Sequence, residues 1–243
     1  MVFTETYTVS WHDTDAGRVA RPSRLLTALQ EMANHQCGTY GKDLDRMRDE
    51  DGKGFILTRL ELRFGALCRA GDVLELSTWI SSAKALSTIR EFRIRKGEET
   101  VLEGSGSWVL VDTGTRALLK VEEYPYPYPA DEPLPFAPPM RLKLPPLEPV
   151  GHRRIVYSDT DYNGHMNNTR YPDLLMDFLP DGIPDEMYPK RMVILYHSGA
   201  PAGENLEILR GPMPDSPYAY GFEARGADGK TCFTALVELR PRG

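Results

Sequence analysis

One short segment brings together polar side chains of the kinds that do chemistry in enzymes. Residues 161–171 read Asp-Tyr-Asn-Gly-His-Met-Asn-Asn-Thr-Arg-Tyr. Within it, Asp161, Asn163 and His165 supply a carboxylate, an amide donor and a titratable imidazole. Such a trio can orient a water molecule, remove its proton and hold a carbonyl oxygen. The residue types therefore indicate acid–base chemistry at a carbonyl group, but they do not name the substrate.

The location of this segment suits that chemistry. It precedes a helical pattern, and the start of a helix offers free amide donors and a partial positive charge to a developing oxyanion. A structural role stays open, because Asp and Asn are favoured in turns and Asn167 or Asn168 could cap the helix. A metal site formed by Asp159, Asp161 and His165 is a further alternative. Those residues match no recognised ligand motif, so we expect neither a metal nor another cofactor.

The segment belongs to one half of an internal repeat. The triplet Asp-Thr-Asp begins at Asp13 and again at Asp159, 146 residues later. A gap of one residue after the triplet then places Gly17 opposite Gly164. A second match pairs AGDVLEL with AGENLEI, 132 residues further along the chain. Two matches in the same order predict two related units.

Each unit opens with a short strand-like run, YTVSW or RRIVYS, before a helical pattern. Residues 25–36 place apolar side chains on one helical face after Pro22, and residues 171–178 repeat this face before Pro180. Runs typical of strands follow each helix, at residues 60–64, 74–79, 88–95, 105–112, 192–196, 206–209, 218–224 and 233–239. This order predicts α+β units in which an antiparallel sheet wraps a long helix.

A proline-rich segment separates the two units. Ten of the twenty prolines lie between Pro125 and Pro149. Proline lacks an amide donor and fixes φ, which excludes a helix or a central strand. We therefore expect residues 123–149 to form a stiff connector between an N-terminal unit, 1–122, and a C-terminal unit, 150–243.

Composition and charge exclude several classes of protein. Hydrophobic residues make up 41% of the 243 residues, enough to build packed cores. The longest apolar runs fall far short of the roughly 18 residues of a membrane span. A net charge of −6 argues against non-specific nucleic-acid binding. The three cysteines lack CxxC spacing and the N-terminus does not read as a signal peptide, so we expect a cytoplasmic protein with reduced thiols.

The polar segment resembles the active-site segment of the acyl-(acyl carrier protein) thioesterases of plants and bacteria, and the chain as a whole resembles the bacterial type. The positions that carry the resemblance are Asp161, Asn163, His165, Asn167, Asn168 and Tyr171. The segments DTDAG, LTRLELRF and SWVLVD are similar to the N-terminal half of the same family. The resemblance implies two tandem hotdog units that form an internal pseudo-dimer. It also implies that the C-terminal unit is catalytic and that the N-terminal unit contributes to the acyl-chain pocket.

The resemblance assigns roles within the polar segment. It implies that Asp161, Asn163 and His165 are catalytic and that Asn167 and Tyr171 bind substrate. Water is the expected attacking species, and either Asp161 or His165 takes its proton. Direct attack by Asp161, which would give an anhydride, stays open. No cysteine nucleophile is expected, because Cys37 lies on an apolar helical face, Cys68 precedes a turn and Cys232 begins a strand.

The first unit lacks part of the polar segment, and one strand of the second unit departs from the family pattern. Asp15 is the counterpart of Asp161 in the first unit, but Ala-Gly-Arg follows it, so we expect a degenerate first site. A structural turn role for Asp13 and Asp15 explains them equally well. Many family members carry a Glu on the strand after the second helix, and the plant forms carry a Cys next to it. Gly199 and Ala200 occupy those positions here, and neither side chain can do chemistry.

We therefore expect an enzyme, a hydrolase of fatty acyl thioesters that acts on acyl carrier protein (ACP) and releases free fatty acid. The alternatives are an acyl-CoA thioesterase, a hotdog dehydratase or hydratase, and a non-catalytic acyl-binding protein. Because carrier proteins are acidic, docking is expected at basic residues, with Arg153, Arg154, Lys190 and Arg191 as candidates. A homodimer is compatible with the sequence, whereas neither nucleic acid nor a membrane span is expected.

Overall fold

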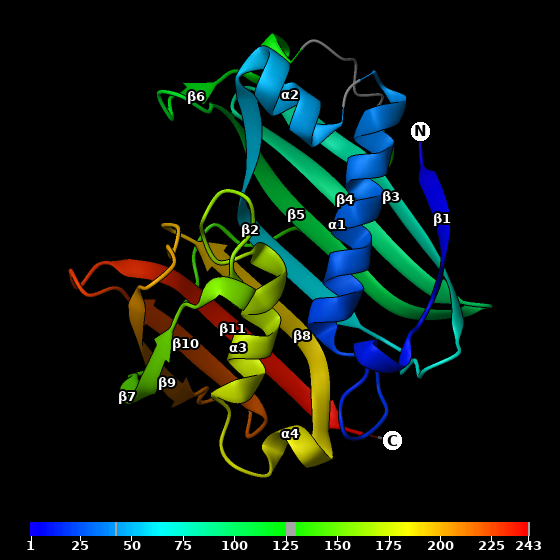
Figure 1. Cartoon of the computed structure of the whole chain (residues 1–243). Coiled ribbons are helices and arrows are strands. Elements are labelled where there is room, and N and C mark those ends of the chain that lie inside the picture. Colours follow the sequence, from blue (N-terminus) through cyan, green and yellow to red (C-terminus); the bar gives the residue numbers. More distant parts are fainter. Residues whose placement is uncertain (42, 125–129, 243) are drawn as a thin grey trace. The chain divides into compact units, whose positions relative to one another are not determined.

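The computed structural model describes residues 1–41, 43–124 and 130–242. The chain divides into two compact units, drawn in Figure 1 with colours that follow the sequence. One comprises residues 1–20 and 24–138, and the other comprises residues 21–23 and 139–243. The division between Pro138 and Pro139 falls inside the segment that is expected to connect the units.

The first unit is an antiparallel sheet with one long helix across it (Figure 1). Its elements are β1 (Phe3–Thr8), α1 (Pro22–Thr39), α2 (Leu44–Asp51), β2 (Lys53–Phe64), β3 (Val73–Lys84), β4 (Ser87–Lys96), β5 (Glu99–Asp112) and β6 (Leu118–Leu119), with 3-10 turns at Trp11–Asp13 and Val121–Glu123. Within this unit the strands pair in the order β1-β3-β4-β5-β2, and β6 pairs with β5. The predicted α+β architecture is confirmed.

Helix α1 buries one face because its apolar residues recur at helical spacing. Leu25 and Met32 are almost fully buried, as the sequence pattern predicts. Further along, Gln36 Oε1 accepts a hydrogen bond at 2.5 Å from Nη1 of Arg90 on β4. The same nitrogen donates to Thr78 Oγ1 on β3 at 3.1 Å. A buried guanidinium with neutral partners therefore ties the helix to the sheet.

The second unit repeats this arrangement with a shorter helix. Its elements are β7 (Glu148–Arg154), α3 (Tyr171–Asp177), α4 (Ile183–Glu186), β8 (Met187–Tyr196), β9 (Asn205–Pro212), β10 (Ala219–Arg225) and β11 (Thr231–Pro241), with 3-10 turns at Tyr157–Asp159 and Asn168–Arg170. Its strands pair in the antiparallel order β8-β11-β10-β9-β7. Tyr171 at the start of α3 packs edge-on against Tyr196 of β8 and Phe233 of β11, at centroid distances of 4.9 and 5.1 Å. Figure 1 shows α3 lying across the sheet of this unit. The aromatic contacts hold it there.

Every predicted strand overlaps an observed one, but helix α2 is absent from the sequence-based prediction. Only Met47 of this helix is buried, so its apolar periodicity is too weak to detect. Its ends are nevertheless encoded locally. Asp43 accepts a hydrogen bond from the Arg46 amide at 2.8 Å, and Gly52 ends the helix with a φ of 63°.

The first part of the proline-rich segment lies against the sheet of the first unit. Residues 125–129 of the predicted connector, 123–149, lie outside the described residues. Beyond them, Trp79 of β3 donates from Nε1 to the Glu132 carbonyl at 2.8 Å, and Leu134 is buried. Residues 130–138 therefore cover part of the first unit.

The second part of the segment lies on two glycines of the second unit. Gly211 of β9 and Gly221 of β10 are paired in the sheet. A Cβ at Gly211 would lie 2.2 Å from the Pro146 carbonyl oxygen, and a Cβ at Gly221 would lie 2.7 Å from Pro145 Cδ. Larger residues at either position would push the proline segment off the strands.

The contact between Gln36 and Arg90 yields a stability prediction. Gln36→Leu keeps the side-chain size but leaves a buried guanidinium with one acceptor fewer, so unfolding free energy should fall by about 1–3 kcal/mol. Urea unfolding followed by circular dichroism measures this change. The control is His35→Leu, next along α1, because His35 pairs with Glu5 on the exposed surface and that loss should stay below about 1 kcal/mol. Equal losses of unfolding free energy in the two variants would mean that the buried hydrogen bonds of Gln36 add nothing to stability.

Candidate active site

A turn over residues 155–167 is held by the first aspartate of its Asp-Thr-Asp triplet. Asp159 is buried, and its Oδ2 accepts a hydrogen bond from the Val156 amide at 3.0 Å. Its Oδ1 accepts from Nη2 of Arg153 at 2.6 Å. The Asn167 amide closes the turn by donating to the Asp159 carbonyl at 2.9 Å. Asp159 is therefore a structural residue, and Arg153 balances its charge.

The backbone of Asn163 links the three predicted catalytic residues. Its N–H donates to Asp161 Oδ1 at 2.8 Å, and its carbonyl accepts from Nδ1 of His165 at 2.9 Å. The turn closes through the Asp161 amide, which donates to the His165 carbonyl at 3.0 Å. Gly164 takes the left-handed φ of 72° that this turn requires. Asp161, Asn163 and His165 thus lie on one turn.

The hydrogen bond of His165 assigns its tautomer. A carbonyl oxygen only accepts, so the ring proton lies on Nδ1, toward the Asn163 carbonyl. In the neutral imidazole, Nε2 is then unprotonated and is able to accept a proton. The ring is half-buried. The geometry provides a base at Nε2.

The two residues predicted to bind substrate are engaged in local structure. Asn167 Oδ1 accepts from the amide and the hydroxyl of Thr169, at 2.9 and 2.8 Å, and so caps the following 3-10 turn. Tyr171 is buried in the aromatic contact with the sheet. Burial, and then the neighbouring Cys232 and Asp161, raise the pKa of Tyr171, so it is a neutral phenol. Contact of Asn167 or Tyr171 with substrate stays a prediction.

The first unit contains the same turn. The Asp15 amide donates to the Val19 carbonyl at 2.9 Å, and the Arg18 amide donates to the Asp15 carbonyl at 3.0 Å. These bonds match those of Asp161 at a constant offset of 146 residues. Arg18 has a φ of 61° and therefore stands where the second unit has Gly164.

The expected one-residue gap between the repeats is wrong. Because the offset stays at 146, Gly17 lies opposite Asn163 and not opposite Gly164. By the same offset, Val19 lies opposite His165. The sequence alignment favoured matching two glycines, whereas the backbone accepts arginine in the left-handed position. The first turn keeps the aspartate but has glycine and valine in the places of Asn163 and His165.

The four predicted docking residues do not form one cluster. Arg153 is paired with the buried aspartate of the turn, and Arg191 pairs with Glu238 at 2.9 Å. Arg154 and Lys190 are exposed. They lie on β7 and β8, which stand at opposite ends of the strand order in the second unit.

The cysteines are poorly suited to nucleophilic catalysis. Cys37, Cys68 and Cys232 are free and buried. Burial raises the pKa of Cys37 and raises that of Cys68 to about 11, so neither thiolate forms readily. Among the described residues, no group of three or more His, Cys, Asp or Glu side chains is placed to hold a metal ion. No helix in this part of the chain has the length and apolar character of a membrane span.

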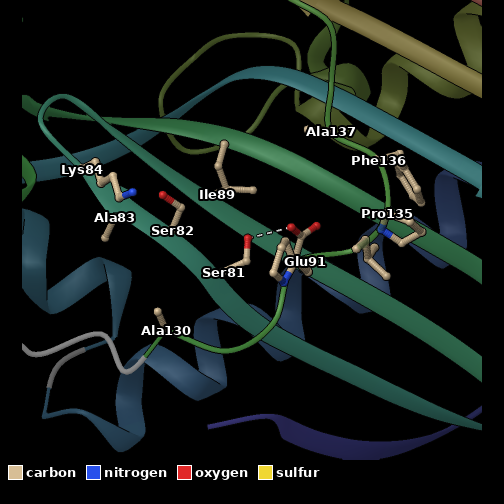
Figure 2. A pocket seen from close by; sticks show the side chains of 12 residues that line it. Ser81, Ser82, Ala83, Lys84, Ile89, Glu91, Ala130, Pro135, Phe136 and Ala137 are labelled. Atoms are coloured by element: carbon tan, nitrogen blue, oxygen red, sulfur yellow. Dashed lines mark hydrogen bonds between the residues drawn. The ribbon is translucent and has the colours of Figure 1, made fainter.

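A pocket of about 690 Å³ lies in the first unit, between β3, β4 and the proline-rich segment (Figure 2). Its polar lining includes Ser81, Lys84 and Glu91, and its apolar lining includes Leu134 and Phe136. Sequence reasoning missed this pocket, because it exists only where the proline-rich segment folds back over the sheet.

Glu91 is a buried acid at this pocket, with 1% of its surface exposed. Its Oε1 accepts a hydrogen bond from Ser81 Oγ at 2.7 Å (Figure 2). Burial raises the pKa of Glu91, and the hydrogen bond from Ser81, followed by the nearby Ser105 hydroxyl and Leu134 amide, only partly opposes this. No described residue makes a hydrogen bond of normal geometry to Oε2.

Comparison with protein families identifies the chain. Residues 1–126 match the acyl-ACP thioesterase N-terminal domain, and residues 151–232 match the acyl-ACP thioesterase C-terminal domain. The chain therefore belongs to the acyl-ACP thioesterase family.

Individual relatives are distant. A chloroplastic palmitoyl-acyl carrier protein thioesterase from Arabidopsis thaliana is 26% identical over 81% of this chain and 52% of its own length. An acyl-ACP thioesterase from Bacteroides thetaiotaomicron has a solved structure similar over 98% of both chains, with a TM-score of 0.87 and 20% identity. The 12:0-ACP thioesterase from Umbellularia californica gives a TM-score of 0.81 and 17% identity, over 99% of this chain and 94% of its own. These structures share the fold. The chain spans about half the length of the curated relatives it matches.

The buried acid of the pocket gives a pH prediction. The native state holds the Glu91 proton more tightly than the unfolded chain does, so stability falls as pH rises from 4.5, the ordinary value, through the raised native pKa. Glu91→Gln removes this fall. At pH 7, the Tm of Glu91→Gln should exceed that of the natural protein by about 2–4 °C for each kcal/mol of unfolding free energy that the variant regains. This difference in Tm should disappear near pH 4. Exposed Glu75→Gln on β3 should show no such pH-dependent gap.

Proposed function

We propose that this protein hydrolyses fatty acyl thioesters of ACP and releases free fatty acid. The observation that carries the proposal is the turn on which Asn163 joins Asp161 to His165 and engages the ring through Nδ1, not through Nε2. Membership of the acyl-ACP thioesterase family supports the substrate class. So does the similarity to a plant relative named for palmitoyl-acyl carrier protein.

In the proposed mechanism, His165 is the general base. Nε2 takes a proton from water, and the water oxygen attacks the carbonyl carbon of the thioester. A positioned base of this kind contributes on the order of 10² to 10⁴ in rate. The exposed Asn163 side chain donates to the oxyanion, an interaction worth roughly 3 kcal/mol. The carbon–sulfur bond then breaks, and the protonated imidazole returns the proton to the leaving thiolate.

Asp161 supports this step electrostatically. Its Oδ1 holds the Asn163 amide, so the carboxylate lies on the same turn as the imidazole without taking the Nδ1 proton. A negative charge at that place stabilises the imidazolium that forms during water activation. Direct attack by Asp161 on the thioester is the competing mechanism. Trapping an acyl–enzyme anhydride would favour it.

We further propose that the two units are hotdog units that pair as an internal pseudo-dimer. The support is the turn that recurs at a constant offset, followed in each unit by a helix and an antiparallel sheet. The second unit is catalytic, and the first contributes to the acyl-chain pocket. We also propose a cytoplasmic location, for which the buried free cysteines are the support.

One assay tests the proposed function against its alternatives. The purified chain is incubated with acyl-ACP and acyl-CoA of varied chain length, and both products are identified. Free fatty acid together with free thiol is the expected result. With 3-hydroxyacyl thioesters included among the substrates, a conjugated double bond on a thioester that stays intact would identify a dehydratase. Binding without turnover would identify an acyl-binding protein, and turnover of CoA esters alone would exclude the carrier protein.

Asp161 and Asp15 occupy equivalent turns, which makes one the control for the other. Asp161→Asn keeps an acceptor for the Asn163 amide but removes the charge, so single-turnover hydrolysis should slow by about 10² or more with acyl binding retained. Asp15→Asn should change the rate by less than about twofold. Circular dichroism verifies the folding of both variants. Loss of turnover on changing Asp15 alone would place the active site in the first unit.

Arg154 is the docking residue that we propose for the carrier, because β7 ends there and the catalytic turn follows directly. Arg154→Glu should lower kcat/KM for acyl-ACP by about tenfold at low salt and affect acyl-CoA much less. Lys190→Glu, an exposed charge reversal on β8, is the matched control and should have little effect. Equal losses on both substrates would contradict docking at Arg154.

A further inference from the structure

Gly199 lies directly against the imidazole of His165. The chain approaches there because the Met166 amide donates to the Ala200 carbonyl at 2.8 Å, and a β-bridge joins His165 to Pro201. A Cβ at Gly199 would lie 2.6 Å from Cδ2 of His165 and 3.2 Å from its Cγ and Nε2. Side chains essentially never approach as closely as 2.6 Å, so alanine does not fit beside the ring in this position.

The requirement for glycine comes from the ring and not from the backbone. Gly199 is not among the glycines with a left-handed φ, so its backbone conformation suits any residue. The ring cannot swing away without losing the bond between Nδ1 and the Asn163 carbonyl. We propose that Gly199 is a positioning residue for His165. The absence of a side chain there lets the imidazole keep Nδ1 on Asn163 with Nε2 uncovered.

The first unit offers an internal comparison. The Ala20 amide donates to the Cys68 carbonyl at 2.9 Å, the bond that corresponds to the one between Met166 and Ala200. Leu67 therefore occupies the place of Gly199, in the unit that has Val19 in place of His165. Where no imidazole lies beside it, the same place in the repeat takes a large side chain. Within one chain, glycine accompanies the imidazole and leucine accompanies the aliphatic residue.

The same contact explains how this chain works without an acid at position 199. The imidazole fills the space that any side chain at 199 would enter, so a carboxylate there and the observed ring position exclude each other. Water activation then falls to His165. This last step rests on the proposed hydrolytic function, whereas the positioning of the ring does not.

The test is a double-mutant cycle in the full-length chain. Gly199→Ala should lower kcat by about 10² with KM changed by less than about threefold, close to the effect of His165→Ala. The double variant should be no slower than His165→Ala, because both changes act through one group. A double variant well below His165→Ala, or a Gly199→Ala variant at the natural rate, would overturn the proposal.

The matched control makes the same change at a glycine that has room for it. A Cβ at Gly38, on α1, would meet no atom within 4 Å, and Gly38 is not among the glycines with a left-handed φ. Gly38→Ala should therefore keep the natural kcat. A loss of rate in Gly38→Ala as large as that in Gly199→Ala would show that the effect does not come from the contact with the ring.

A second measurement does not depend on turnover. Proton–nitrogen NMR of the five histidines should show His165 with its proton on Nδ1 in the natural protein, and this tautomer should be lost or mixed in Gly199→Ala. Thermal unfolding should show that Gly199→Ala destabilises the natural protein but not the His165→Ala variant. If the chain hydrolyses no thioester while both results hold, the proposed function fails and the positioning role stands. An unchanged His165 spectrum in Gly199→Ala would overturn the positioning role.

Discussion

The site depends on the backbone of one residue. The amide of Asn163 holds the Asp161 carboxylate and its carbonyl holds the His165 ring, so a single stretch of main chain sets the positions of both titratable groups. Main-chain carbonyls are present whatever the side chain, which makes this arrangement tolerant of sequence change. The equivalent turn around Asp15 keeps its main-chain bonds although its side chains differ. The turn is therefore a recurring main-chain structure, and in the second unit it carries a carboxylate, an amide and an imidazole beside the space at Gly199.

The sequence predicts the architecture because strand alternation and helical spacing are local properties. Among the described strands, only the two-residue β6 has no counterpart in the predicted runs, and Pro22 begins α1 as expected. Helix α2 escapes prediction because it buries a single residue, Met47, so its boundaries depend on the caps at Asp43 and Gly52. The path of residues 130–138 is also beyond a local pattern, since Trp79 binds it from a strand more than fifty residues away.

The sequence reveals which residue types make up the candidate site, but it does not reveal their geometry. Spacing places an aspartate, an asparagine and a histidine on a turn, yet it cannot tell that Asp159 is buried and structural while Asp161 keeps part of its surface in solvent. Matching Gly17 to Gly164 misaligns the repeats. The residue equivalent to Gly164 is Arg18, which adopts the same left-handed backbone conformation. From the sequence alone, Gly199 is a position that lacks a catalytic side chain. The contact distances show that the absence of a side chain there leaves space for the His165 ring. The sequence shows which side chains are present. Only the packing shows that the His165 ring requires a neighbouring residue without a side chain.

The proline segment on Gly211 and Gly221 has a consequence for how such chains change length. Pro145 and Pro146 lie on the two glycines, and β7 begins at Glu148 with a single residue between. The count of residues on that side is fixed, because one inserted residue would shift either the prolines or the register of β7. Insertions and deletions should therefore accumulate on the N-terminal side of Pro145. The glycine pair therefore fixes the number of residues between the prolines and the start of β7.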